Sequence, residues 1–193
     1  SGSISLTVCV PTAILSSAAL KRAVEACLKS SPQGDCSEDP HGPIAGWDVS
    51  SVTNMDSMFM GATSFNGDLS KWDVSSTINM DSTFSQTSFN GDLSKWDVSR
   101  VIGMTGMFSR TSFTGDLSKW DVSRVTDMSH MFMRARSFNG DLSSWDVSTV
   151  TDMSSMFLET SFDNDVSEWD ISSVTSMKYM FQDASSFNHE LCE

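Results

Sequence analysis

Apolar and polar positions repeat along this chain with a period of 24 or 25 residues. The apolar columns hold Trp, Met and two Phe residues. The Trp column consists of Trp47, Trp72, Trp96, Trp120, Trp145 and Trp169. A fixed period in the twenties is typical of one supersecondary unit per repeat, stacked on its neighbours to form a solenoid. Either five or four residues separate the two Phe columns, and this variation predicts a surface loop between them.

Two local patterns predict the elements of each unit. Residues 71–75 alternate polar and apolar side chains, which predicts a short strand with its Trp and Val on the buried face. Met55, Met58 and Phe59 have the spacing i, i+3, i+4, which predicts a short helix with one apolar face. The Asn-Gly and Gly-Asp pairs after the second Phe predict a turn. We therefore expect an α/β solenoid, a right-handed superhelix of short parallel strands and short helices.

The repeat divides the chain into two parts. Residues 1–43 are predicted to form an N-terminal cap of one strand and one helix, and residues 44–193 hold about six repeats. The alternating apolar residues between positions 4 and 10 predict the strand, and Ser17 is placed to cap the helix. No apolar run approaches the roughly 20 residues of a membrane span. The repeat restarts at Phe187 without a cap, so either the chain is truncated or its last coil is covered by a neighbouring molecule, and the exposed apolar columns favour a partner or self-association at that end.

Four cysteines lie outside the regular part of the repeat. Cys27 and Cys36 flank a Pro/Gly turn and are placed to close a small disulfide loop, as in secreted proteins. Cys9 and Cys192 would lie at opposite ends of the rod, whereas a disulfide needs Cα atoms within about 7 Å. Two alternatives stay open: Cys9 competes for a cap partner, or all four thiols are free.

The formal net charge is −13, with 25 acidic and 12 basic residues, and this balance argues against nucleic acid as a partner. Most of the aspartates form two columns. The first Asp column follows each Trp and contains Asp48, Asp73, Asp97, Asp121, Asp146 and Asp170. The second Asp column lies in the turn and contains Asp68, Asp92, Asp116, Asp141 and Asp165. Lys71, Lys95 and Lys119 lie beside them.

The aspartate columns have two interpretations. In the first, their side chains accept hydrogen bonds from nearby backbone amides in Asx turns or helix caps. In the second, the second column binds Ca²⁺, which favours clustered carboxylate oxygens. The chain contains no EF-hand loop, so this column is a weak metal candidate, and no other cofactor is expected.

The consensus F-N-G-D-L-S-K-W-D-V-S-x-V-T-x-M-x-x-M-F closely resembles the BspA-like branch of leucine-rich-repeat surface proteins, and the resemblance covers roughly residues 44–191. It implies a fold like that of leucine-rich repeats, a surface location and a role in binding or adhesion, and it implies no catalytic residues. The chain departs from ordinary leucine-rich repeats at one position. Where those repeats carry a ladder of Asn residues, this sequence has Val52, Thr77, Val101, Val125, Val150 and Val174.

The positions of the histidines do not indicate a catalytic site. His41 lies in a Pro/Gly linker and His130 on a predicted helix surface, where both are expected to be solvated, and no catalytic spacing or nucleotide-binding loop occurs. The chain is therefore predicted to be a non-enzymatic binding or adhesion module of a secreted or cell-surface protein. The first Asp column and the three lysines, on the exposed strand face, are expected to contact a protein or glycan.

Two alternatives remain at this point. One is a structural subunit of an extracellular or organelle-lumen assembly, which stacks through its open C-terminal coil. The minor one is a Ca²⁺-binding solenoid.

Overall fold

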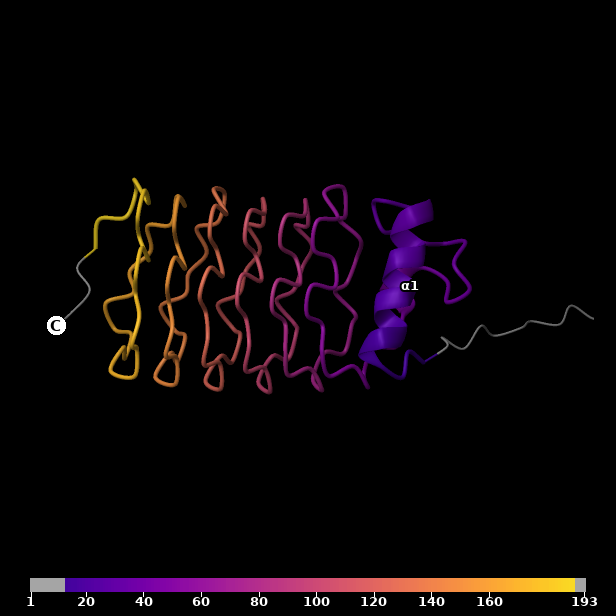
Figure 1. Ribbon diagram of the computed structural model, residues 1–193, viewed down its shortest axis with the longest axis horizontal. Helices are drawn as coiled ribbons and strands as arrows, with labels where there is room; N and C mark the ends of the chain where they lie inside the picture. Colours follow the sequence, from indigo (N-terminus) through magenta and orange to yellow (C-terminus); the bar gives the residue numbers. More distant parts are fainter. Residues whose placement is uncertain (1–12, 190–193) are drawn as a thin grey trace, which may run out of the picture.

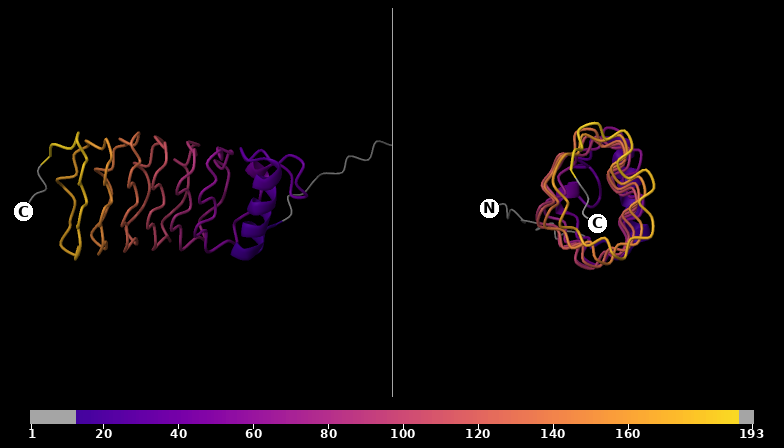
Figure 2. Two further views of the ribbon diagram at one scale, coloured as in Figure 1. Left: turned by 45° about the horizontal axis from the view of Figure 1, so that its top comes forward. Right: turned by 90° about the vertical axis from the view of Figure 1, so that its left-hand side faces the viewer.

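The computed structural model describes residues 13–189, and they form a stack of similar coils that is covered at its N-terminal end by one helix (Figure 1). Helix α1 spans Ser17–Ser30, and a 3-10 turn, η1, spans Ile44–Gly46. Seen along the stack, successive coils overlie one another (Figure 2). We number the coils by their Trp residues: coil 1 (47–71), coil 2 (72–95), coil 3 (96–119), coil 4 (120–144), coil 5 (145–168) and coil 6 (169–189).

The predicted fold class is wrong. Within residues 13–189 the repeats contain no helix, and their only β-structure is a series of isolated parallel bridges, so the chain is not an α/β solenoid of parallel strands and short helices. One residue of each coil takes part in these bridges: Asn54, Asn79, Gly103, Asp127, Asp152 and Ser176. Turns and irregular backbone make up the rest of each coil.

The segment that was predicted to be helical consists of β-turns. The amide of Met58 donates to the carbonyl of Met55 at 3.1 Å, and Ser57 between them has a left-handed φ of 55°. The amide of Met55 does not take part in a helix, because it donates to the carbonyl of Asn79 in the next coil at 2.8 Å. Consecutive turns therefore place Met, Met and Phe inside at the same i, i+3, i+4 spacing that predicted a helix.

The segment that was predicted to be a strand is also made of turns. The amide of Trp72 donates to the carbonyl of Leu69 at 3.0 Å, and the amide of Thr77 donates to that of Val74 at 2.8 Å. The expected inward orientation of the Trp column is nevertheless correct, because all six side chains are buried. An alternation of buried and exposed residues can thus arise from turns as well as from a strand.

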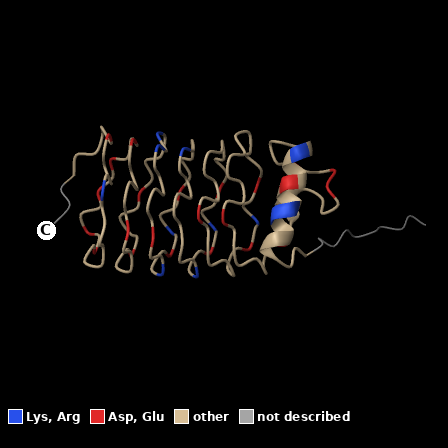
Figure 3. Cartoon of the chain, in the orientation of Figure 1, with Lys and Arg blue, Asp and Glu red and all other residues tan. Residues whose placement is uncertain are grey.

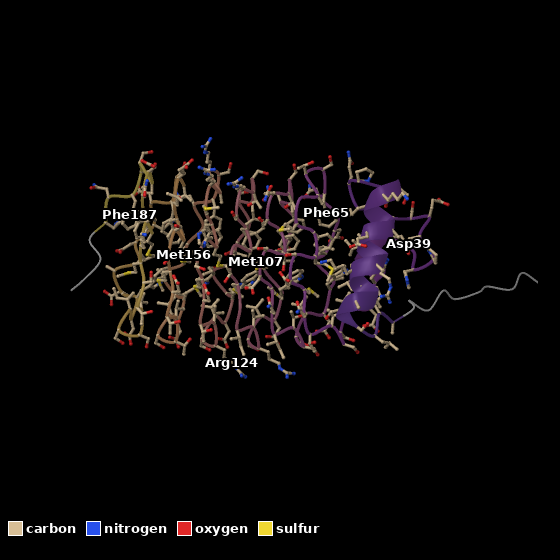
Figure 4. All side chains as sticks on the ribbon, in the orientation of Figure 1. Asp39, Phe65, Met107, Arg124, Met156 and Phe187 are labelled. Carbon is tan, nitrogen blue, oxygen red and sulfur yellow. A yellow bond between two sulfur atoms is a disulfide. The ribbon has the colours of Figure 1, made fainter. Side chains whose placement is uncertain are left out.

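The core consists of columns of identical side chains that stack along the rod. The two Phe rings of one coil stack with centroids 3.8–4.4 Å apart. Neighbouring rings of the first Phe column lie 5.4–5.7 Å apart. Figure 4 labels Phe65, Met107, Met156 and Phe187 at successive positions along this core. Burying each such ring stabilises the fold by about 2–3 kcal/mol, which explains why the columns recur in the sequence.

Helix α1 closes the N-terminal end of the stack. Ser16, one residue before the predicted cap, accepts the Ala19 amide at 3.2 Å, and Leu20 and Val24 are buried. A disulfide joins Cys27 to Cys36, whose Cα atoms are 5.3 Å apart, in the pairing that the sequence suggested. The cap therefore packs on coil 1 and is closed covalently.

Some predictions concern residues that the structure does not describe. The predicted strand between positions 4 and 10, Cys9 and Cys192 all lie outside the described residues. In the described part of the chain, no helix is both long enough and apolar enough to cross a membrane.

Candidate binding face

Every aspartate of the two columns closes a turn of the form D-x-S. Its Oδ1 atom accepts a hydrogen bond from the amide of the serine two residues later, at 2.9–3.1 Å in all eleven turns. In seven turns the serine hydroxyl also donates to the same oxygen, at 2.6–2.7 Å. The Asx-turn interpretation is thus confirmed, and each carboxylate has a fixed orientation.

These hydrogen bonds favour the charged form of the carboxylates. The Ser99 hydroxyl, and then its amide, lower the pKa of Asp97 below its ordinary value of 3.8. In eight other aspartates the hydroxyl and the amide of the serine in the same turn lower the pKa in this way: Asp48, Asp68, Asp92, Asp116, Asp141, Asp146, Asp165 and Asp170. The side chains remain exposed to solvent, so the columns present negative charge to any approaching partner.

Basic residues accompany the aspartates along only part of the rod. Lys71, Lys95 and Lys119 are exposed, and none of them lies within 4.0 Å of a carboxylate among the described residues. In coils 4 and 5 the same position of the repeat, directly before the next Trp, is occupied by Ser144 and Glu168 instead of lysine. Figure 3 shows how the charged residues are distributed along the stack, and Figure 4 shows Arg124 extending away from it. The charge of this surface thus changes from mixed to acidic toward the C-terminus.

We call this surface the D-x-S face, defined by the eleven aspartates of the two columns and the three lysines. It contains all the residues that the sequence predicted for ligand binding, but turns rather than strands carry them. Its regularity follows from the fold, since each coil contributes one aspartate of each column in the same place.

The structure brings no metal site together on this face. Among residues 13–189, no three or more His, Cys, Asp or Glu side chains are grouped so that they could hold an ion. Each aspartate of the second column instead uses Oδ1 within its own turn. The predicted Ca²⁺ column therefore lacks the convergent oxygens that this ion favours.

The two histidines singled out by the sequence have different surroundings. His41 is half-buried and packs edge-on against Trp47, with ring centroids 5.8 Å apart. Its Nδ1 atom is buried without a hydrogen-bond partner among the described residues, so the ring is only partly solvated. His130 is exposed, as expected, but it occupies a left-handed turn position with φ 60° rather than a helix surface.

Two further polar columns were not recognised in the sequence. Asn66 accepts the amide of Asn90 at 2.8 Å through its Oδ1 atom, and Asn90 accepts that of Thr114 at 2.8 Å, so the Asn after the second Phe links one coil to the next. Asn79 and Asp127, just before the Met column, each close a further Asx turn. The recurring F-N-G string and the Asn or Asp before Met were the signals that could have revealed them.

Comparison with known proteins gives one match. The family described as Mycoplasma protein of unknown function, DUF285, matches residues 33–120 and again residues 109–193. No curated protein and no solved structure matches the chain. The two matching segments together contain the entire repeat region.

Proposed function

We propose that this chain, which belongs to the DUF285 family, is a non-enzymatic binding module that contacts a protein partner through its D-x-S face. The observation that carries the proposal is the regular array of exposed carboxylates, each held in place by the serine of its own turn. Because these groups are already ordered, a partner that pairs with them would lose little conformational entropy on binding.

The charge of the face favours a partner with basic groups. A net charge of −13 attracts such a partner over a distance and raises its rate of association. A glycan is the less favoured ligand, because the six Trp side chains, which could stack on sugar rings, are all buried. Lys71, Lys95 and Lys119 add positive charge to coils 1 to 3. They therefore favour a partner that also carries acidic groups opposite these coils.

We place this module on a cell surface or in a secreted protein. The Cys27–Cys36 disulfide supports this location, because disulfides persist in oxidising compartments. An organelle lumen would satisfy the same condition. The relationship to BspA-like surface proteins remains a prediction, based on the resemblance of the repeat.

The experiment compares two variants that lose the same charge from the same coils. Asp121→Asn/Asp146→Asn removes two carboxylates from the D-x-S face and keeps both turns, since an asparagine oxygen can accept the same amide. Asp127→Asn/Asp152→Asn is the matched control, because these residues close turns of the column before Met. Each variant and the parent chain are immobilised and exposed to extracts of cell-surface proteins, and captured proteins are purified and titrated by surface plasmon resonance.

We expect the face variant to bind a captured protein about tenfold more weakly than the control does, with binding that weakens as salt rises. Equal affinity for the two variants would disprove the role of this face. The same chains are applied to a glycan array, and binding there without any protein partner would replace the proposal with glycan recognition.

A further inference from the structure

One side of the rod carries charges in an order that the repeat itself does not require. It is formed by the turn between the two Phe columns, where each coil contributes the residue at a left-handed position. In coils 3 to 6 these residues are Arg110, Arg134, Glu159 and Asp183, with φ between 54° and 59°. We call these four residues the charged edge. Along the chain it reads positive, positive, negative, negative.

The backbone of neighbouring coils keeps the charged edge in line. The amide of Arg110 donates to the carbonyl of Met133 at 2.7 Å, and the amide of Arg134 donates to that of Leu158 at 2.7 Å. Each acceptor directly precedes the next residue of the edge, so the charged side chains leave the rod from equivalent points. Figure 3 shows basic residues along the upper edge of two coils and acidic residues along the upper edge of the two coils that follow toward the C-terminus.

The two inner charges are paired within the chain, whereas the two outer charges are not. Arg134 donates to the Glu159 Oε1 atom at 2.9 Å through Nε and at 2.7 Å through Nη2, and Arg136 donates to Oε2 at 3.0 Å. Arg110 and Asp183 are exposed, and neither lies within 4.0 Å of an opposite charge among the described residues. The edge therefore has a free positive charge on one side and a free negative charge on the other.

Two apolar side chains lie at the middle of the charged edge. Met133 and Leu158 directly precede the inner charges in the same turns, and both are partly exposed. In coils 2 and 3 the same position is a buried serine, Ser85 or Ser109. The edge thus combines an apolar centre with a charged periphery, as protein interfaces do.

The order of the charges is complementary to itself. A second copy, rotated by half a turn about an axis between coils 4 and 5, presents negative, negative, positive, positive to the first. Arg110 then faces Asp183 of the partner subunit at both ends of the contact, and the apolar centres of the two copies meet. Such a twofold contact uses the same surface on both copies. A parallel arrangement in register would instead place like charges opposite each other.

We propose that two copies of this chain bind side by side and antiparallel through the charged edge. The net charge of −13 on each copy opposes association, so the local order of charges must outweigh a general repulsion. Four coils span only about 15–20 Å at the roughly 4.8 Å spacing of adjacent parallel chains. The contact is therefore small, and the dimer dissociates readily. It uses no residue of the D-x-S face, so each proposal can fail without the other.

The test exchanges the two outer charges in the full chain, first singly and then together. Sedimentation velocity at about 10–500 µM protein measures the fraction of dimer. Arg110→Glu and Asp183→Lys should each weaken dimerisation about tenfold or more, because each places like charges opposite each other. The double variant Arg110→Glu/Asp183→Lys should dimerise like the parent, because it restores opposite charges at both ends.

A mixture of the two single variants gives the sharpest result. In a mixed antiparallel dimer every outer pair again joins opposite charges, so the mixture should associate about as tightly as the parent although neither variant does so alone. This rescue also shows that both variants are folded. Asp183→Lys makes the net charge of the chain less negative, so its weaker association cannot come from general repulsion.

Matched controls make the same charge changes in the same or a neighbouring coil, away from the charged edge. Arg100→Glu changes an exposed residue of coil 3 in the column of Arg124, which Figure 4 shows at the lower side of the rod. Glu168→Lys changes an exposed residue of coil 5 directly before Trp169. Both should change the dimerisation constant by no more than about twofold.

Three outcomes would overturn the proposal. They are a monomer at every concentration, single variants that associate no better when mixed, and controls that weaken association as much as the edge variants do. Species larger than a dimer that grow with concentration would also overturn it, because they would indicate an open-ended contact instead of a twofold one.

Discussion

The indole nitrogen of Trp96 donates a hydrogen bond to the carbonyl oxygen of Leu69, 27 residues earlier, at 3.0 Å. The same oxygen accepts the Trp72 amide of its own turn, also at 3.0 Å. Equivalent indole bonds of 2.8–3.0 Å are made by Trp72, Trp120, Trp145 and Trp169, and each joins the turn that ends at that Trp to the turn that ends at the preceding Trp. Because the L-x-x-W turns form no backbone hydrogen bonds to one another in the described part of the chain, the Trp side chains link them along this side of the stack.

Trp96→Phe should therefore destabilise the chain by about 2–4 kcal/mol. The substitution removes the indole donor and leaves a small cavity in a position that is only 4% exposed. Urea unfolding followed by circular dichroism measures the loss. Phe84→Leu is the control, since it reduces the volume of the same core without removing a hydrogen bond. A Trp96→Phe loss no larger than that of the control would contradict the role of the indole bond.

The sequence predicted which side chains face inward better than it predicted the backbone. The Trp column is buried as expected, and so are the Met and Phe columns up to coil 5, because burial requires only that identical residues recur once per coil. The backbone was misjudged because tandem turns reproduce the alternation of a strand and the i, i+3, i+4 spacing of a helix. The left-handed φ of 58° at Gln86 and 59° at Arg134 could not be foreseen, since neither residue type favours this conformation.

The one-residue difference between repeats shows what else the sequence did not reveal. In coil 1 the amide of Phe65 donates to the carbonyl of Ala62 at 2.9 Å. In coil 2, which is one residue shorter here, the Thr87 hydroxyl donates to the Phe84 carbonyl at 2.8 Å and accepts the Phe89 amide at 3.3 Å. A threonine hydroxyl thus replaces a backbone turn, which explains how both lengths keep the Phe columns aligned.

Acid should destabilise the chain through the D-x-S turns. Nine of their aspartates have a pKa lowered below the ordinary value of 3.8 by serine hydroxyls and amides. A carboxylate with a lowered pKa stabilises the folded state fully above its unfolded value, and this contribution disappears as the pH falls through the folded value. We therefore expect constant urea midpoints between pH 7 and about 5, and a steep fall below about pH 4.

The variant Ser99→Ala/Ser148→Ala tests the cause of this fall. It removes the hydroxyl donors of two turns and keeps the amide donors, so the pKa values of Asp97 and Asp146 should rise toward normal. Its stability should then decline less below about pH 4 than that of the parent. An identical pH profile in the two proteins would show that the hydroxyls do not set these pKa values.

Left-handed backbone conformations in the turns predict that replacing a glycine there lowers stability, whereas introducing a glycine there raises it. Gly61 has φ 77°, and a Cβ atom added there would meet no atom within 4 Å, so Gly61→Ala tests the conformation alone. Gln86 occupies the equivalent position with φ 58° and is exposed. We expect Gly61→Ala to cost about 1 kcal/mol and Gln86→Gly to add about 0.5 kcal/mol, measured by urea unfolding. A loss of stability in both variants would argue against left-handed strain at this position.

Opening the Cys27–Cys36 bond should loosen the cap. The two residues are nine positions apart, and closing a loop of that size stabilises a chain by roughly 2–3 kcal/mol in the entropic description. Thermal unfolding with and without reductant measures the change, and Cys27→Ala/Cys36→Ala should match the reduced parent and lose its response to reductant. A parent chain with the same midpoint under both conditions would contradict a stabilising role for the disulfide.

Asp81 supplies the hydrogen-bond acceptor that Gly103, which has no side chain, cannot provide. Gly103 lacks the side chain that would close the Asx turn of coil 3, and Asp81 of coil 2 accepts the Thr105 amide in its place at 2.8 Å. A Cβ atom on Gly103 would lie 2.9 Å from the Asp81 Oδ1 atom. The two residues therefore cannot be changed independently.

Gly103→Asp should cost about 1–2 kcal/mol, because the new carboxylate meets the one already present. Asp81→Ser should cost about 1 kcal/mol, because the Thr105 amide loses its acceptor. The double variant should return to within about 0.5 kcal/mol of the parent, since the carboxylate introduced at position 103 could then close its own turn, as Asp127 does for Ser129 at 2.8 Å. Urea unfolding of the four proteins completes a double-mutant cycle, and additive losses would show that Asp81 does not substitute for the missing side chain.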